Sequence, residues 1–253
     1  VGGEGPGKPS AILKWDGTAW GGQGSGTVKG LTGVSGVSGA SGGTVMWAVG
    51  AAGTIVKGDG TGWTVAASDT TADLAAVWAG DAGDAWAVGA RGQAVHWNGS
   101  AWKSAATSTL SPIRAVWGRD SRNVWAAGDM GLMLKWDGTS WGPQSSPTLS
   151  DLNALWGADG SNIWAAGSGG GIIRFDGTAW TTERSSSTAA LYGLAGSSAS
   201  EVWSVGDAGL VQRRNGMTWE NRAGGAVDQY TSVWGSAANN IWAVGGGGRI
   251  SHW

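Results

Sequence analysis

Tryptophan side chains recur at one position of an internal repeat and could stack on the apolar face of a sugar. They are Trp78, Trp117, Trp156 and Trp234, spaced 39 residues apart except where Ala195 interrupts the series. Sugar sites combine such rings with a few polar groups. Arg119 and Asp120 follow Trp117 closely and could bond sugar hydroxyls. Because this position tolerates alanine, the rings could be partly exposed and stack on a sugar, although packing between neighbouring repeats is the interpretation we favour for the position itself.

A basic or potentially basic side chain occupies a second repeated position. Its members are Lys14, Lys57, His96, Lys135, Arg174, Arg213 and His252. They could form a series of anion sites. The interpretation we favour is structural: a long side chain lies over an aromatic surface, with a carboxylate partner such as Asp84 or Glu201. Because both histidines belong to this series and the chain has no cysteine, neither a histidine base nor a metal cluster is predicted.

Catalytic constellations are not evident. A sialidase-like site needs several convergent arginines and a paired Tyr and Glu, but the arginines here are scattered. The two tyrosines, Tyr192 and Tyr230, occupy different positions of the repeat. We therefore predict no enzyme activity and no cofactor.

The repeat that spaces these residues has a strict period. Every tryptophan of the chain, 20 in all, belongs to one of four series. Besides the first series, these are Trp47, Trp86, Trp125, Trp164, Trp203 and Trp242; then Trp20, Trp63, Trp102, Trp141, Trp180 and Trp219; and then Trp15, Trp97, Trp136 and Trp253, with Phe175 in place of one member. A period of this length indicates one supersecondary unit repeated along the chain.

Each repeat reads as four short strands, for example 74–78, 85–89 and 133–136 for the first three, with the fourth starting at a tryptophan. An Asp-Gly or Asn-Gly pair precedes the fourth strand and predicts a type I′ hairpin turn. Four antiparallel strands in 39 residues are typical of a β-propeller blade and too short for a βαβ unit. The uninterrupted fourth-strand tryptophans are predicted to be buried between blades.

The number of blades depends on how the chain ends are aligned with the repeat. Val1-Gly2 and 12–15 match 244–245 and 250–253, so the chain opens near the end of a second strand. Seven third strands favour seven blades, one of them incomplete. Six blades are the alternative, with 18–20 supplying the outer strand of the last blade. We expect residues 1–253 to form a single propeller domain of a longer protein.

The repeat pattern Trp-Ala-x-Gly followed by Trp-Asp-Gly-Thr-x-Trp resembles a degenerate Asp-box propeller repeat, shortened because Asp16 and Trp20 are only four residues apart. It is similar to the repeats of Ycf48-type photosystem II assembly factors and to Trp-rich repeats of secreted myxobacterial proteins. A weaker likeness is to fucose-binding propeller lectins, but the repeating Arg and Glu pair of those lectins is missing. The resemblance implies a propeller and leaves the function open.

The amino-acid composition argues against nucleic acid and the membrane interior as partners of this chain. The net charge is −2 and only 13% of residues are charged, so no basic excess suits nucleic acid. No apolar run approaches the roughly 20 residues of a spanning helix, so membrane insertion is not predicted.

Two functions remain. The first is a lectin-like, carbohydrate-binding module of a bacterial protein, outside the cell, at its surface or in the periplasm. The alternative is a protein-interaction or assembly scaffold. Repeated positions favour many equivalent sugar sites, whereas singular residues such as Arg114, Arg119, Arg122 and Met130 favour one protein partner. The oligomeric state is left open.

Overall fold

The computed structural model of the chain describes residues 10–38, 43–222 and 228–253, and the alignment of Val1-Gly2 with a second strand lies outside them. The chain forms two compact units. Unit 1 comprises the described residues up to 124 together with 136–142, and unit 2 comprises 125–135 together with the described residues from 143 onward.

Unit 1 contains two complete blades and a hairpin. Blade 1 has the strand order β3 (Leu31–Ser38), β4 (Thr44–Gly50), β5 (Ile55–Gly58) and β6 (Trp63–Ala66). Blade 2 has the order β7 (Leu74–Asp81), β8 (Asp84–Gly89), β9 (Ala94–Trp97) and β10 (Trp102–Ala105). The strands β1 (Ala11–Trp15) and β2 (Trp20–Gly24) pair only with each other within the described part of the chain, with Trp15 opposite Trp20.

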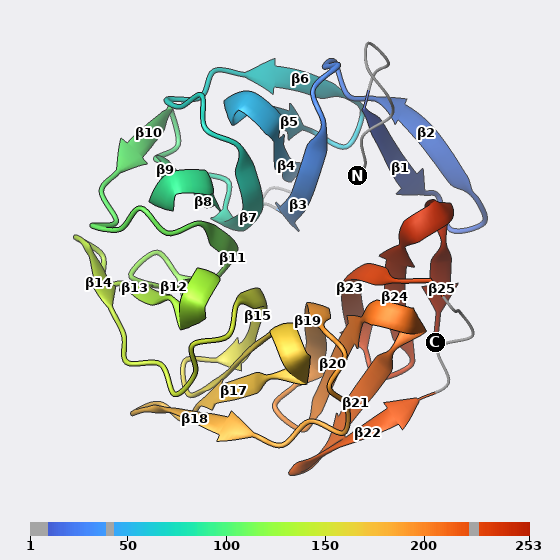
Figure 1. Cartoon of the computed structure of the whole chain (residues 1–253). Helices are drawn as coiled ribbons and strands as arrows, with labels where there is room; N and C mark the ends of the chain where they lie inside the picture. Colours follow the sequence, from blue (N-terminus) through green and yellow to red (C-terminus); the bar gives the residue numbers. More distant parts are fainter. Residues whose placement is uncertain (1–9, 39–42, 223–227) are drawn as a thin grey trace. The chain divides into compact units, whose positions relative to one another are not determined.

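The strands of blade 3 are divided between the units and those of blades 4 to 6 belong to unit 2. Blade 3 consists of β11 (Ile113–Asp120), β12 (Asn123–Gly128), β13 (Met133–Trp136) and β14 (Trp141–Pro143). Blade 4 consists of β15 (Leu152–Asp159), β16 (Asn162–Gly167), β17 (Ile172–Phe175) and β18 (Trp180–Glu183). Blade 5, drawn in orange in Figure 1, consists of β19 (Leu191–Ser198), β20 (Glu201–Gly206), β21 (Val211–Asn215) and β22 (Thr218–Arg222). Blade 6 has β23 (Tyr230–Ala237), β24 (Asn240–Gly245) and β25 (Ile250–His252).

This architecture is the predicted all-β propeller of four-stranded antiparallel blades. Six blades are present in the described residues, which is the alternative count rather than the favoured seven. The seventh third strand is β1, whose hairpin with β2 contains neither a first nor a second strand. Residues 18–20 therefore belong to the β1–β2 hairpin, in which Trp20 pairs with Trp15.

The apolar runs of the second strands explain where the core lies. All six residues of β8 are buried, because the strand has a paired strand on each side and packed side chains above and below. First strands of successive blades pack against one another: β3, β7 and β11 in unit 1, and β15, β19 and β23 in unit 2. Neighbouring blades are thereby brought into contact through their first strands.

Short 3-10 turns join second to third strands at recurring Gly-x-x-Gly sequences. They are η1 (Ala51–Gly53), η2 (Ala90–Gly92), η3 (Asp129–Gly131), η4 (Ser168–Gly170), η5 (Asp207–Gly209) and η6 (Gly246–Gly248). The middle residue has a positive φ even where it is not glycine, as at Met130 with φ 55°. The loop before β15 supports this turn, because the Met130 N–H donates to Asp151 Oδ1 at 3.0 Å.

The loops between third and fourth strands differ from the predicted type I′ turn. In the β1–β2 loop the backbone N–H groups of Thr18 and Ala19 both donate to Asp16 Oδ1, at 2.8 Å. Gly17 has a φ of +105°, whereas Asp16 does not have a positive φ, which a type I′ turn requires at both central residues. The carboxylate thus closes a four-residue loop. Equivalent side chains do so at Asp59, Asn98, Asp137 and Asp176.

Candidate functional site

Tryptophan rings of successive blades interlock along each unit. The ring of Trp47, on β4, lies 4.9 Å from that of Trp97 and 5.0 Å from that of Trp102 in the next blade. Trp86 has the same neighbours one repeat later, Trp136 at 4.8 Å and Trp141 at 5.0 Å. The second-, third- and fourth-strand series are therefore used for packing between blades.

The prediction of buried fourth-strand tryptophans is confirmed for four members, Trp102, Trp141, Trp180 and Trp219. It is wrong for Trp20, which is 38% exposed, because Trp20 belongs to the two-stranded sheet rather than to a blade. Trp63 is half-buried and donates through its indole N–H to Gln23 Oε1 at 2.9 Å.

Six of the seven residues at the repeated basic position have the predicted structural role. Lys14 differs: its sheet lacks the second strand of a blade in the described part of the chain, and its Nζ donates to the Gly60 carbonyl at 2.9 Å. The other cations lie over the second-strand ring of their own blade: Lys57 at 5.4 Å, Lys135 at 5.1 Å, Arg174 at 5.5 Å and Arg213 at 5.7 Å. The rings of His96 and His252 stack on Trp86 and Trp242 at 4.4 and 4.0 Å. Such stacks are favourable because the indole face is electron-rich.

Most of these basic groups also have a partner at the start of the second strand. His96 Nε2 lies 2.6 Å from Asp84 Oδ1, and Arg213 Nε donates to Glu201 Oε1 at 2.6 Å, as predicted. The hydrogen bonds that Arg213 donates to Glu201 raise the pKa of the Arg213 guanidinium. At the same position Arg174 meets an amide instead, because its Nη2 donates to Asn162 Oδ1 at 2.5 Å.

The first-strand tryptophans predicted to bind sugar lie on separate blades. The ring of Trp78 lies against Gly118 of the next first strand, where a Cβ would come within 2.6 Å of it. Trp156 lies against Gly196 in the same way, at 2.7 Å. Both rings are half-buried, as is Trp117, whereas Trp234 is 61% exposed. Ala195 is buried, so its presence in the series does not mark an exposed position.

Arg119 and Asp120 lie at the β11–β12 turn, close to Trp117 in sequence. The Asp120 carboxylate accepts hydrogen bonds from Asn123 Nδ2 at 2.8 and 3.1 Å and from the Arg122 N–H at 3.0 Å. The Asn123 bonds are the largest cause of a lowered Asp120 pKa. Asp120 therefore stabilises its own turn, while the Arg119 side chain is more than half exposed, with Nε 3.5 Å from Asp120. Sugar binding by this set stays a prediction.

Unit 2 departs from the repeat at Arg214, which occupies the third-strand aromatic position of blade 5. Its guanidinium lies 5.0 Å over Trp164 of blade 4. Arg214 Nη2 and Nε donate to the two carboxylate oxygens of Glu183 at 2.9 and 3.1 Å, and Nη1 donates to the Ala199 carbonyl at 2.9 Å. An ion pair thus replaces an aromatic contact.

Glu183 also accepts two indole N–H groups. Trp164 Nε1 and Trp219 Nε1 donate to Glu183 Oε2 at 3.1 and 2.8 Å. The side chains of Arg214 and Glu183 are only 7% and 15% exposed. By contrast, the buried indole N–H groups of Trp47, Trp86, Trp102, Trp141 and Trp180 make no hydrogen bond within the described part of the chain. The polar cluster of Glu183, Arg214, Trp164 and Trp219 therefore joins blades 4 and 5 through hydrogen bonds that these five indoles lack.

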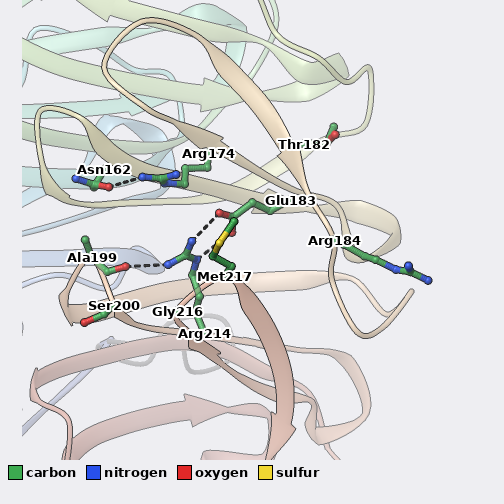
Figure 2. A pocket seen from close by; sticks show the side chains of 10 residues that line it. All are labelled: Asn162, Arg174, Thr182, Glu183, Arg184, Ala199, Ser200, Arg214, Gly216 and Met217. Carbon is green, nitrogen blue, oxygen red and sulfur yellow. Dashed lines mark hydrogen bonds and ion pairs between the residues drawn. The ribbon is translucent and has the colours of Figure 1, made fainter.

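A cavity of about 540 Å³ lies beside this cluster, between blades 4 and 5 (Figure 2). Asn162 and Arg174 come from β16 and β17, Glu183 from β18, and Arg214 from β21. Met217, in the β21–β22 turn, also lines it and is 89% exposed. In Figure 2 the Arg184 side chain extends away from the others. Unit 1 has a cavity of about 560 Å³ lined by Arg91, Gly92, Gln93 and 104–110, but without a buried charge.

Sequence reasoning missed this cavity. The signal was available, because Arg214 stands where the third-strand series has Trp97, Trp136, Phe175 and Trp253.

In the described residues no group of three or more His, Cys, Asp or Glu side chains is placed to hold a metal ion. No helix in the described part is long and apolar enough to cross a membrane.

No protein-family model matches the chain, and no curated protein sequence matches it. Solved structures with a similar fold include Ycf48 bound to a D1 peptide (17% identity, TM-score 0.74, covering 95% of this chain and 84% of that one). Ycf48 from Cyanidioschyzon merolae is 18% identical, with a TM-score of 0.68 over 90% of this chain and 83% of the other. The WD40 propeller domain of Doa1 is 12% identical, with a TM-score of 0.75 over 95% and 84%. The Ycf48-type resemblance is thus confirmed at the level of the fold.

Proposed function

We propose that this chain is a non-catalytic protein-interaction module that binds a peptide segment of its partner at the cavity between blades 4 and 5. The observation that carries the proposal is that repeated residues pack within and between blades, whereas residues that occur once border a cavity. The repeated basic side chains stack on tryptophans, and the repeated Trp47, Trp86, Trp97 and Trp136 pack between blades. Arg214 and Glu183, which break the repeat, border a cavity.

A similar fold is known to hold a peptide, since one of the structural neighbours is Ycf48 bound to a D1 peptide. That fact supports the class of ligand and says nothing about which peptide this chain binds. The half-buried position of Trp78 and Trp156 against glycines of the next blade also favours packing over many equivalent sugar sites.

Carbohydrate binding is retained as the second candidate because the Trp234 ring is 61% exposed. A ring of that exposure on a first strand could stack on one sugar. The prediction that the protein acts outside the cell, at its surface or in the periplasm stays a prediction, to be checked by cell fractionation.

One paired experiment separates the two candidates. The chain is immobilised and used to select from a displayed library of random peptides, and the same preparation is applied to a glycan array. We expect a peptide family to be enriched and to lose binding when Met217→Asp places a charge at the cavity. Enrichment of no peptide, together with saturable glycan binding that is lost in Trp234→Ala, would contradict the proposal.

A further inference from the structure

We infer that the cavity between blades 4 and 5 binds a peptide carboxylate and that Arg174 is the group that holds it. This rests on the proposed protein-binding function. It names the chemistry of the ligand and one residue that recognises it.

The basic residues of the repeat differ in the charge of the group that they face at the start of the second strand. The basic residue of blade 2, His96, faces the carboxylate of Asp84, and that of blade 5, Arg213, faces Glu201. Arg174 of blade 4 faces the neutral amide of Asn162. In the described part of the chain its only other close partner is the Trp164 ring. Arg174 thus carries a positive charge that no carboxylate at the start of its second strand balances.

The Arg214 guanidinium, which lies over the same ring as Arg174, already has a carboxylate partner. Trp164 has two cations over its ring, Arg174 at 5.5 Å and Arg214 at 5.0 Å. Glu183 is the carboxylate at this place, and its oxygens already accept two bonds from Arg214 and two from indole N–H groups. Glu183 therefore balances Arg214, and one positive charge remains beside the cavity.

Arg174 also has a hydrogen-bond donor that the described residues leave unpaired. Arg174 Nε is buried and makes no hydrogen bond within the described residues. A guanidinium presents its N–H groups as a rigid fork that matches the two oxygens of a carboxylate. Nε itself is out of reach of solvent, but Arg174 is half-buried and lines the cavity. A ligand carboxylate there would bond the accessible edge of the guanidinium and supply the negative charge that the Arg174–Asn162 pair lacks.

The surroundings indicate that the carboxylate belongs to a peptide with an apolar neighbour. Met217 lines the cavity, is exposed, and lies near Glu183 and Arg214 in Figure 2. A flexible thioether can pack against an apolar side chain of varied shape. The hydroxyl groups of Thr182 and Ser200 also line the cavity and could bond a peptide backbone.

The test uses three fluorescein-labelled nonapeptides of one Leu-rich and Ser-rich sequence. The first has a central Glu and an amidated C-terminus, the second has Gln at that place and is amidated, and the third has Gln and a free C-terminal carboxylate. Anisotropy titrations at low salt should show the Glu peptide or the free-carboxylate peptide binding about 10-fold tighter than the neutral one, as expected for a charged hydrogen bond. The stronger of the two identifies the source of the carboxylate.

Variants assign the effect to Arg174. Arg174→Met should abolish the preference for the carboxylate, and Arg174→Lys should keep part of it because a point charge remains without the fork. Lys135→Met is the matched control: Lys135 has the same place in blade 3 and does not line the cavity, so its loss should leave the preference unchanged. Near-UV circular dichroism checks that each variant keeps its tertiary structure. If Arg174→Met fails to fold, the Arg174→Lys comparison decides.

Equal affinity of the wild type for all three peptides, or an unchanged preference in Arg174→Met and Arg174→Lys, would overturn the inference. So would the absence of any binding. These outcomes are separate from failure of the proposed function, because peptides enriched by display that bind without a carboxylate would leave the protein-interaction role intact.

Discussion

Arg214 lies 5.0 Å over the ring of Trp164, at the place where Trp136 lies 4.8 Å from Trp86 in unit 1. A cation has thus replaced an indole in a contact that is otherwise built from aromatic rings. Burying a guanidinium costs desolvation free energy, and the bidentate pair with Glu183 offsets it. The contact between blades 4 and 5 therefore contains a buried ion pair in addition to its apolar packing.

Glu183→Ala should destabilise the protein by about 3–5 kcal/mol, because it leaves the buried Arg214 charge without a counter-charge and two indole N–H groups without their acceptor. Urea unfolding measures the loss. The double variant Glu183→Leu with Arg214→Met should be much more stable than Glu183→Ala. The control is Glu220→Ala, which breaks an exposed pair with Arg222 and should cost under about 1 kcal/mol. Equal losses in Glu183→Ala and Glu220→Ala would contradict the account.

Trp141→Ala should cost about 3–5 kcal/mol, because the buried ring packs edge-to-face on Trp86 at 5.0 Å. Trp20→Ala removes a ring at the same repeat position that is 38% exposed, and should cost about 1 kcal/mol. The comparison is made by thermal or urea unfolding. Losses of similar size would show that burial between blades is not what stabilises this series.

Lys135→Met should change the free energy of unfolding by no more than about 1 kcal/mol. The methionine keeps the apolar contact with Trp125, over which the Lys135 ammonium lies at 5.1 Å. Chemical unfolding at two salt concentrations measures the change. A larger loss at both concentrations would mean that the cation–π contact contributes more than an exposed charge normally does.

Acid should destabilise the loops between third and fourth strands. Hydrogen bonds from Ser140 and Thr139 lower the pKa of Asp137 from 3.8 to about 2, and those from Thr178 and Ala179 act likewise on Asp176. A lowered folded-state pKa contributes stability that is present above pH 3.8 and is lost as the pH falls toward 2. Asp137→Asn should reduce this loss, since Asn98 makes the same loop bonds without titrating. Unfolding midpoints at pH 5 and pH 2.5 test it, and an identical pH dependence in the variant would contradict it.

The fold was predictable from sequence because repetition reports what every blade needs. The series that contains Trp47 and Trp86, and the basic residues that stack on it, recur because each blade makes the same contacts with its neighbours. Even the partners Asp84 and Glu201 could be named, since they stand at the start of the second strand. The type of turn between third and fourth strands could not be predicted, because the Asp16 side chain bonds the loop backbone and competes with the hairpin geometry that Asp-Gly usually adopts.

The cavity was missed for the opposite reason. Arg214 and Glu183 come from different blades, 31 residues apart. Arg214 is an exception to the third-strand aromatic series, and Glu183 belongs to no repeated series. An exception gives no periodic signal, and pairing two of them requires knowing which strands face each other across a blade boundary. The first-strand tryptophans were misleading in a related way, because the glycines at Gly118 and Gly196 that receive their rings belong to the next blade.

The measurement that tests the central claim most directly is an NMR titration of the tryptophan indole N–H signals with a peptide enriched by display. Trp164 donates to Glu183 beside the cavity and has Arg174 over its ring, so its signal should move most, followed by that of Trp219. The Trp156 ring stacks on Trp164 at 5.9 Å, so its signal is not a reference. The signals of Trp78, Trp117 and Trp234 should stay in place. Movement centred on those three, with the Trp164 signal unchanged, would contradict the account and place the ligand on the first strands.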